Sequence, residues 1–270
     1  MKKPKNIKRK DNDVTNEEWK KQMNNLDLAT RTKNDLFKYL KSVLNFGSKW
    51  YDFNFNSMYN KMTNFNNPNE MPKEMEFWTY EEFNKFISVE GDIKFKALYE
   101  TLYYCGCRSG EVRGITWKDI DFKNKELSIN KNIIENIDGN KFLVSTPKTK
   151  SSIREIPIPD KLIDDLIKLK VIQKSIFGFT EEWYVFGSFE PLGKSVMRDR
   201  KNNNCKLAGV KQIRIHDFRH SCASLLINNG ANITMVAKYL GHTKIDETLN
   251  TYAHMFKNKL GEIVDTINNL

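Results

Sequence analysis

The spacing of apolar positions predicts a chain that is mostly helical, with strands near its middle. In the second half, apolar residues recur every three or four positions, as they do on one face of a helix. The helices predicted there cover residues 160–173, 194–208, 216–228, 232–240, 244–256 and 258–268. Between residues 126 and 158, β-branched residues collect in three segments separated by turns at "IDGN" and "PKTKSS". We therefore expect a mainly α fold with a small three-stranded antiparallel β-sheet.

Further helices are predicted in the first half, and their ends carry sequence signals. One helix has an apolar stripe and precedes Gly47, which we expect to end it. Its stripe consists of Leu36, Leu40, Val43 and Leu44. Thr79 followed by Glu82 has the spacing of a capping box, so another helix begins there. The helix in "KFKALYETLYYCG" is expected to stop at Gly106.

These signals divide the chain into four regions. Residues 1–25 are polar and basic and form a tail. Residues 26–66 form a small helical unit with few apolar residues for its length. Residues 67–76 contain two prolines without periodicity, which is typical of a linker. Residues 77–270 form the main domain.

Composition adds a class of partner to this picture. The chain has 44 Lys and Arg against 34 Asp and Glu, a net charge of +10. This excess favours a polyanionic partner, most simply nucleic acid, although an A·T-rich source genome also yields many Lys, Asn and Ile residues. No apolar run is long enough for a membrane span, and the basic start "MKKPKNIKRK" lacks the apolar stretch of a secretory signal.

The cysteines favour a reducing compartment. They form no CxxC pair and lie in apolar or helical segments, at Cys105, Cys107, Cys205 and Cys222. We therefore expect free thiols and a cytoplasmic protein.

Two basic stretches carry candidate phosphate ligands. Arg108, in "CGCRSGEVRG", falls at the junction of two helices, where a guanidinium can reach into a cleft and bind phosphate through parallel hydrogen bonds. Lys148 and Lys150 lie in a predicted hairpin turn. Each of these residues, taken alone, also fits an ordinary solvated side chain.

The stretch "RIHDFRHSCASLL" gathers basic residues at the start of a helix. His216, Arg219 and His220 share one side, because residues three and four apart are neighbours on a helix. Histidines at this spacing can ligate zinc, but no acidic residue or cysteine completes a set of ligands. We therefore expect neither a metal nor another cofactor.

The stretch "YLGHTKIDETLNTYAHMF" contains His242 and Tyr252. Its apolar stripe consists of Ile245, Leu249, Tyr252, Ala253 and Phe256. The periodicity directs Tyr252 toward the core, which by itself favours a packing role over chemistry.

Together, these residues resemble the tyrosine recombinases, the phage-type integrases of mobile elements. The resemblance covers residues 76–256 and rests on "GCRSGEVRGITWKDID", "TPKTKSSIREIPIP", "HDFRH" and "LGHTKIDETLNTYAH". It implies a mainly α catalytic domain with a small sheet, preceded by a helical core-binding domain that is incomplete here. The catalytic residues that it implies are Arg108, Lys148, His216, Arg219, His242 and Tyr252. Glu111 matches an acidic position of the family and would orient its neighbours.

The resemblance implies cleavage and rejoining of DNA without a metal. Arg108, Arg219 and His242 would stabilise the charge that spreads over the phosphate oxygens in the transition state. Tyr252 would attack the phosphorus and become linked to a 3′ phosphate, with His216 accepting its proton.

The leaving 5′ oxygen also needs a proton. Lys148 would supply it as general acid, with Lys150 two residues away as the alternative. His220 would pack or form a structural hydrogen bond.

The resemblance also implies partners. These are double-stranded DNA at recombination sites, further copies of the chain in a tetramer on paired DNA, and accessory DNA-bending or excisionase proteins; without DNA the chain would be a monomer. The candidate DNA-binding residues are Arg31, Lys38, Lys41 and Lys150. A C-terminal apolar face would dock on a neighbouring subunit or pack within its own chain; it consists of Leu260, Ile263, Val264 and Ile267.

Two other functions remain open at this point. One is a remnant that occupies recombination sites without cutting them, and the other is a type IB topoisomerase, which uses similar chemistry. The compact size and the "LGHTKIDETLNTYAH" pattern favour the recombinase, which would serve the integration or excision of a mobile element.

Overall fold

The fold consists of two compact units, Met1–Lys73 and Glu74–Leu270. In this computed structural model, the described residues are 18, 21–23, 25–51, 63–66, 75–135, 142–146, 153–242, 245–246, 248–249, 251–252 and 267–268. No helix in these ranges is long and apolar enough to cross a membrane.

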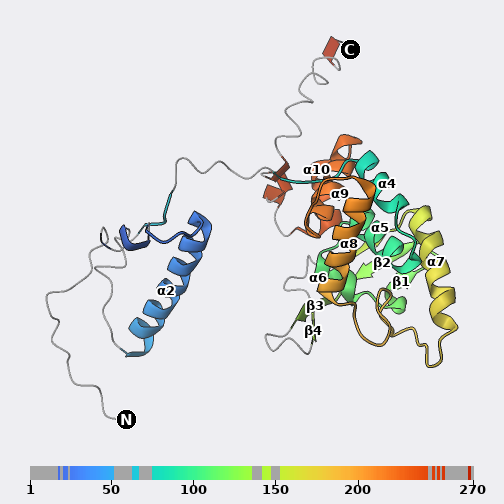
Figure 1. The fold of residues 1–270 in the computed structure, drawn as a ribbon, viewed down its shortest axis with the longest axis horizontal. Coiled ribbons are helices and arrows are strands. Elements are labelled where there is room, and N and C mark those ends of the chain that lie inside the picture. The colour runs from blue at the N-terminus through green and yellow to red at the C-terminus, as the bar shows by residue number, and fades with distance from the viewer. Residues whose placement is uncertain are drawn as a thin grey trace. The chain divides into compact units, whose positions relative to one another are not determined.

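The first unit is built around helix α2 (Thr30–Tyr51), which Figure 1 shows in blue. Phe37 is buried on this helix against Met23 and Phe65. The side-chain amide of Asn34 donates to the carbonyl of Phe65 at 3.0 Å and accepts from its backbone N–H at 2.7 Å. These bonds attach an extended segment to the helix beside a small apolar cluster.

Two predictions for this helix are wrong. Leu36 and Val43, expected in a buried stripe, are exposed, because the small cluster covers only the face around Phe37. Helix α2 also continues through Gly47 to Tyr51. A glycine inside a helix costs about 1 kcal/mol relative to alanine. Contacts of the Phe46 ring with the rings of Trp50 and Tyr51, at centroid distances of 6.3 and 6.1 Å, cross the glycine and offset that cost.

The second unit contains one helix that begins, and another that ends, where the sequence predicts. The start of α4 (Tyr80–Ser88) carries the capping box of Thr79 and Glu82. The last residue of α5 (Ile93–Cys105) is followed by Gly106 in the left-handed conformation, with φ of 59°. Both signals are local, since each lies within one helical turn of the end that it defines.

Helix α5 is the centre of the second unit. It is buried along most of its length and packs against α7 (Asp160–Lys174) and α9 (Asp217–Asn228), which flank it in Figure 1. Aromatic rings fill the space between α4, α5 and α9: Trp78 contacts Phe218 edge-on at 5.0 Å, and Phe83 stacks on Tyr103 at 3.8 Å. This apolar packing fixes the direction of α9, which carries several candidate site residues.

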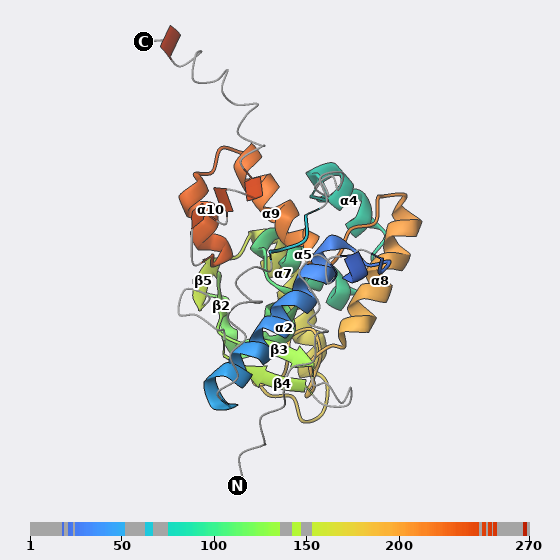
Figure 2. The same cartoon turned by 90° about the vertical axis from the view of Figure 1, so that its left-hand side faces the viewer.

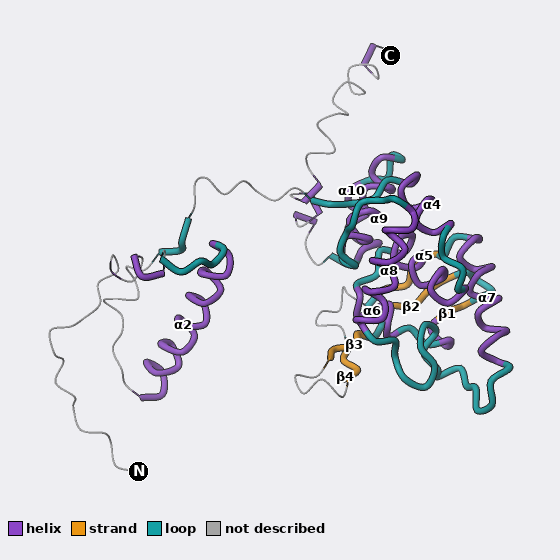
Figure 3. The backbone as a smooth tube through the Cα atoms, viewed as in Figure 1, coloured by secondary structure: helices purple, strands orange, loops and turns teal. Residues whose placement is uncertain are grey.

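The strands form two small sheets and not the single three-stranded sheet that the sequence predicts. The first sheet has the order β1-β2-β5 and the second pairs β3 with β4; all pairs are antiparallel. The strands are β1 (Ile120–Asp121), β2 (Glu126–Ile129), β3 (Asn132–Glu135), β4 (Phe142–Ser145) and β5 (Arg154–Pro157). Figure 3 shows the β3–β4 pair apart from β1 and β2.

The segment "ELSINKNIIEN", predicted as one strand, divides at Asn130 and Lys131. The Asn130 side chain donates to the Asp119 carboxylate at 3.0 Å, and the Lys131 ammonium forms an ion pair with the same carboxylate. Because both polar side chains bind inward, the chain leaves the first sheet and re-enters a strand on the second. The broader prediction, a mainly α fold with small antiparallel sheets, is confirmed.

The remaining elements complete the unit, and Figure 2 shows α8, α9 and α10 from a second direction. They are α6 (Ser109–Gly114), the 3-10 helix η1 (Trp117–Asp119), α8 (Lys194–Ala208) and α10 (Ile233–Leu240). The helices predicted at 244–256 and 258–268 are described only at residues 245–246, 248–249, 251–252 and 267–268, which are helical. All four cysteines are buried free thiols, as expected.

Candidate active site

Arg108 stands where α5 ends and α6 begins. The left-handed Gly106 turns the chain there, and a Cβ atom on it would collide with the side chain of Leu240. The Arg108 backbone N–H donates to Glu111 Oε2 at 2.9 Å, and its Nη1 donates to Glu111 Oε1 at 2.7 Å. The guanidinium is half-buried, so it is oriented by a carboxylate and still reaches solvent.

Glu111 connects two arginines. It is buried on α6 and accepts hydrogen bonds from Arg108 and from Arg154 Nη2, the latter at 3.1 Å. Burial alone would raise the pKa of Glu111, but the charges and hydrogen bonds of Arg154 and Arg108 outweigh it and hold the pKa below its ordinary value. Glu111 is therefore an ionised anchor for both guanidinium groups, which fits the orienting role expected of it.

Arg219 is the most deeply placed cation of the site. Its side chain is 2% exposed on α9, and Nη1 donates to the Gly106 carbonyl at 2.9 Å. Within the described chain, its buried Nη2 has no hydrogen-bond partner. Burial and the positive charges of Arg108 and Arg154 lower its pKa to about 10. A buried guanidinium with an unused donor is costly to hold without an anion.

His242 follows α10 after another left-handed glycine. Gly241 has φ of 70°, and a Cβ there would lie 2.9 Å from Arg154 Nη1. The His242 Nδ1 atom is 2.6 Å from the Thr248 hydroxyl. Burial, followed by the charges of Arg219 and Arg108, lowers the pKa of His242 to about 4, so the ring is neutral at neutral pH. It lies within the electrostatic reach of both arginines.

Tyr252 is buried, as its periodicity predicts, but two other members of the predicted stripe are not; Ala253 and Phe256 lie outside the described residues. Ile245 and Leu249 are exposed, whereas Thr248 is fully buried, four residues before Tyr252. The buried face of the segment is therefore the one with Thr248, because this hydroxyl binds His242. Burial raises the pKa of the Tyr252 phenol, and the charge of Arg219 opposes that rise.

The Tyr252 hydroxyl lies 2.8 Å from Nδ1 of His220. His216, the residue expected to take the proton of Tyr252, is exposed at the start of α9. Its ring meets that of His220 edge to face, with the ring centroids 5.1 Å apart. The pKa of His216 is lowered by its partial enclosure and by the charges of Arg219 and Arg108. His220 thus contacts the phenol, whereas the proton-accepting role of His216 stays a prediction.

A cleft of about 510 Å³ opens beside Arg108. Its lining includes His216 and Lys194 as well as Arg113, which forms an ion pair with Glu135 at 3.2 Å. The walls come from α6, from β3 and from the starts of α8 and α9. The excess of basic side chains makes this cleft suitable for an anionic group.

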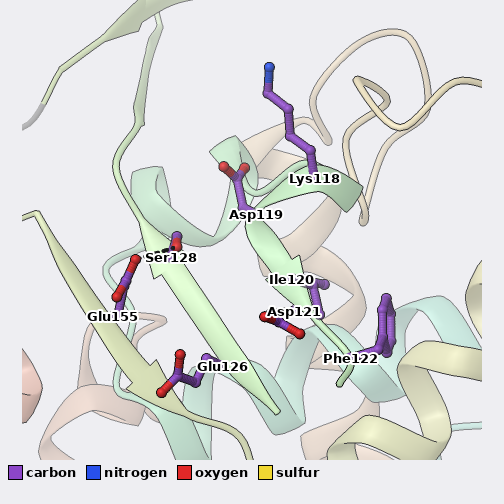
Figure 4. Close-up of a pocket in the computed structure, with 8 residues that line it drawn as sticks. All are labelled: Lys118, Asp119, Ile120, Asp121, Phe122, Glu126, Ser128 and Glu155. Atoms are coloured by element: carbon purple, nitrogen blue, oxygen red, sulfur yellow. Dashed lines mark hydrogen bonds between the residues drawn. The ribbon is translucent and has the colours of Figure 1, made fainter. Parts of the chain in front are cut away.

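A second hollow has the opposite character (Figure 4). The carboxylates of Asp121, Glu126 and Glu155 surround it, and the Lys118 ammonium at its edge is paired with Glu182 at 2.6 Å. Phosphate would be repelled there. In the described ranges, no group of three or more His, Cys, Asp or Glu side chains is arranged to hold a metal ion.

The other candidate residues lie outside the described residues or in the first unit. Lys148 and Lys150 lie outside the described residues. Lys38 is paired with Asp35 at 3.4 Å on the exposed surface of α2, and the Lys41 ammonium lies 4.5 Å from the Phe37 ring centroid. Arg31 is exposed near the start of the same helix. Their role in DNA binding stays a prediction.

Two contributors were missed in the sequence. Arg154 donates through Nε to the Tyr239 carbonyl at 2.9 Å and so joins β5 to the end of α10. Its signal is an arginine two residues before the buried Ile156, on the inward side of a strand. Thr248 carries no comparable signal, because a polar residue that follows Glu247 and lies outside the predicted apolar stripe is expected to be solvated.

Comparison with known proteins agrees with this geometry. Residues 73–259 match the Phage integrase family, so the chain belongs to that family. The chain is 35% identical over 206 residues to the ICEBs1 integrase of Bacillus subtilis strain 168, covering 73% of this chain and 55% of that protein. It is 33% identical over 216 residues to an XerC-like tyrosine recombinase of Caldanaerobacter subterraneus subsp. tengcongensis, with the same 73% and 55% coverage. The resemblance seen in the sequence is thereby confirmed.

The fold is also similar to a solved structure. The Tn1549 transposon integrase in complex with transposon right-end DNA superposes with a TM-score of 0.69 at 21% identity, covering 93% of this chain and 87% of that one. At this identity the likeness shows a shared fold. The chain spans about half the length, 55%, of the curated relatives described above.

Proposed function

We propose that this chain is a site-specific DNA recombinase that cleaves and rejoins DNA through a phosphotyrosyl intermediate, for the integration or excision of a mobile element. The observation that carries this proposal is the buried Arg219, whose Nη2 lacks a partner in the described chain, within the electrostatic reach of Arg108 and Tyr252. A buried cation beside a tyrosine suits a ligand that is an anion and also contains an atom that the tyrosine can attack. A phosphodiester meets both conditions, because it is negatively charged and its phosphorus is electrophilic.

The arginines would bind the scissile phosphate. Arg108 reaches solvent from the junction of α5 and α6, and Arg219 has a donor to spare. Fixed guanidinium donors stabilise the charge that develops on non-bridging phosphate oxygens, and they are more effective where water is excluded. His242, neutral and held by Thr248, would add a further donor through Nε2.

Tyr252 would be the nucleophile. Its oxygen forms a bond to phosphorus while the bond from phosphorus to the 5′ oxygen breaks, which leaves a 3′-phosphotyrosyl link. The phenolic proton passes to a neighbouring base, for which His216 is the candidate, and Lys148 protonates the departing 5′ oxygen. Attack by the 5′ hydroxyl of another strand reverses these steps. One phosphoester is exchanged for another, so the bond energy is conserved.

Strand exchange requires more than one copy. We propose double-stranded recombination sites as substrate and a tetramer assembled on two paired duplexes. The basic balance of the chain, a net charge of +10, favours such binding because each phosphate contact releases condensed counterions. DNA-bending or excisionase proteins would act as accessory partners.

A nicked suicide duplex that carries the element's own junction tests the chemistry. Cleavage releases a short fragment with the 5′ hydroxyl, and because this fragment diffuses away, the covalent adduct cannot be religated and accumulates. The wild-type chain should form an adduct that survives denaturation, and Tyr252→Phe should form none while binding DNA with unchanged affinity. Tyr80→Phe is the matched control, since it removes an exposed hydroxyl from the same unit. DNA binding without any adduct would indicate a non-cutting remnant, and relaxation of supercoils without strand exchange would indicate a topoisomerase.

A further inference from the structure

His220 is a histidine to which the proposed chemistry gives no role. It is half-buried on α9, directly after Arg219. Its Nδ1 lies 2.8 Å from the Tyr252 hydroxyl oxygen, and the two rings meet at 63° with centroids 5.9 Å apart. This distance is that of a good hydrogen bond, so His220 touches the atom that would attack phosphorus.

The charges around the contact set the protonation state of His220. On α9 and the loop before it, His216, Arg214 and Arg219 face His220 as actual or potential cations, and Asp217 as an anion. Burial and these cations outweigh Asp217 and lower the pKa of His220 to about 4.

The phenol is also in its uncharged form. On its side, burial and Cys222 raise the pKa of Tyr252, against the charge of Arg219. Both groups are therefore neutral near pH 7. In the His220 tautomer that carries its proton on Nε2, Nδ1 is free to accept from the phenol, which keeps its own proton.

We propose that His220 is a positioning residue for the attacking tyrosine: its Nδ1 accepts the hydrogen bond of the Tyr252 hydroxyl and so sets the direction of the oxygen lone pairs. The inference rests on the proposed function of Tyr252. His220 acts through the phenol before attack, and in the attack step this hydrogen bond gives way as the proton passes to the proposed base, His216. A phenolic O–H lies in the plane of the ring and can point to either side of the C–O bond. An acceptor on one side selects one of these two directions.

The placement on α9 makes this arrangement rigid. Arg219, a proposed phosphate ligand, and His220 are consecutive residues of one buried helix. The same stretch of backbone therefore positions both the phosphate and the attacking tyrosine. The start of α9 is fixed by Asp217, which accepts from the Arg214 backbone N–H at 2.7 Å and from its guanidinium. Groups held by a rigid element reach the attack geometry with less loss of entropy.

Two substitutions of His220 separate positioning from packing. In His220→Asn, the amide oxygen stands near the place of Nδ1 and still accepts a hydrogen bond, whereas His220→Leu fills a similar volume without an acceptor. Single-turnover adduct formation on the suicide duplex should slow by about tenfold in the leucine variant and stay within about threefold of wild type in the asparagine variant. DNA affinity and thermal midpoint should match in both.

Two results would overturn the inference. One is a leucine variant that reacts at the wild-type rate. The other is an asparagine variant as slow as the leucine variant, with both folded, because an acceptor alone would then not suffice.

A second measurement does not depend on activity. The chain has four histidines, so the imidazole nitrogens of a ¹⁵N-histidine sample can be assigned by substitution. The Nδ1 resonance of His220 should move in Tyr252→Phe and stay unchanged in Tyr80→Phe. If wild type makes no adduct but this shift occurs, the proposed function fails and the contact stands. If the resonance does not move, the inference fails whatever the adduct assay gives.

Discussion

At the scale of single residues, Arg219 combines a poor position for stability with a good one for binding an anion. It is 2% exposed, and its buried Nη2 has no hydrogen-bond partner in the described chain. An unpaired donor on a buried charge disfavours folding, but a phosphate that accepts from it recovers the interaction. A substitution of Arg219 should therefore lower the activity without lowering the stability of the free protein.

Arg219→Gln tests this separation. The amide is uncharged and too short to reach the Gly106 carbonyl, so the buried charge and the bond of Nη1 are removed together. We expect adduct formation to fall by about 100-fold or more, since a donor to the transition state is lost. The thermal midpoint should equal or exceed that of wild type. A midpoint several degrees lower would instead show that the guanidinium stabilises the free protein.

His242 predicts a dependence of stability on pH. Its folded pKa is about 4, below the usual value near 6.5, so between these values the unfolded chain binds the proton more readily. Protonation then favours unfolding as the pH falls through this window. Above about pH 6.5 the ring is neutral in both states and the effect vanishes.

The thermal midpoint of His242→Asn, compared with that of wild type, measures this effect. The thermal midpoint of the wild type should fall more than that of the variant between pH 6.5 and pH 4. From pH 7 to pH 8, the curves of thermal midpoint against pH should run parallel for the two proteins. Comparing the two proteins cancels groups that act in both, such as Glu100, whose burial beside Asp165 raises its pKa to about 7. Parallel curves at acid pH would contradict the neutral, enclosed histidine.

At the scale of elements, Arg154 holds three of them together. From β5 it reaches Glu111 on α6 and the Tyr239 carbonyl on α10. Since Glu111 also orients Arg108, and the end of α10 carries His242, one side chain supports two proposed phosphate ligands.

Arg154→Met should therefore reduce both stability and cleavage. It leaves a buried carboxylate with one arginine in place of two, and we expect a loss of about 2 kcal/mol or more in the free energy of unfolding, measured in denaturant. Lys118→Met, which breaks an ion pair with Glu182 between exposed side chains, is the matched control and should change little. Equal effects in the two variants would remove Arg154 from its proposed supporting role.

Elements could be predicted from the sequence where their signals are local. The capping box of Thr79 and the stop at Gly106 lie within one helical turn of the ends that they define. The strand break after Ile129 could not be foreseen, because it depends on Asp119, a residue of η1 that binds both Asn130 and Lys131.

The same distinction holds for the site. Arg108, Arg219, His242 and Tyr252 could be selected because their residue types and order match a family. In the structure, Arg219 interacts electrostatically with each of the other three. The contact of Tyr252 with His220 depends on how a separate segment lies against α9. No spacing along the chain encodes that contact, since thirty-two residues separate its partners.

At the scale of the whole molecule, the C-terminal segment is expected to serve assembly. Removing residues 257–270 deletes the predicted apolar face and leaves Tyr252 in place. Binding to one recombination site should persist, while the pairing of two sites, measured by native electrophoresis of mixed duplexes, should weaken by about tenfold or more. Unchanged pairing would show that the segment packs within its own subunit.

The left-handed glycines make the site sensitive to handedness. Gly106 and Gly241 end the helices from which Arg108 and His242 emerge, and Leu240 occupies the space that an L-side chain at Gly106 would need. Shrinking Leu240 would remove that collision but not the strain of a positive φ, which L-residues avoid and D-residues prefer. A D-alanine introduced at Gly241 by chemical ligation should therefore keep the backbone path that L-alanine would distort. The spacing between Arg108 and His242, the two proposed phosphate ligands, thus depends on two glycines, the achiral residue that adopts a positive φ without strain.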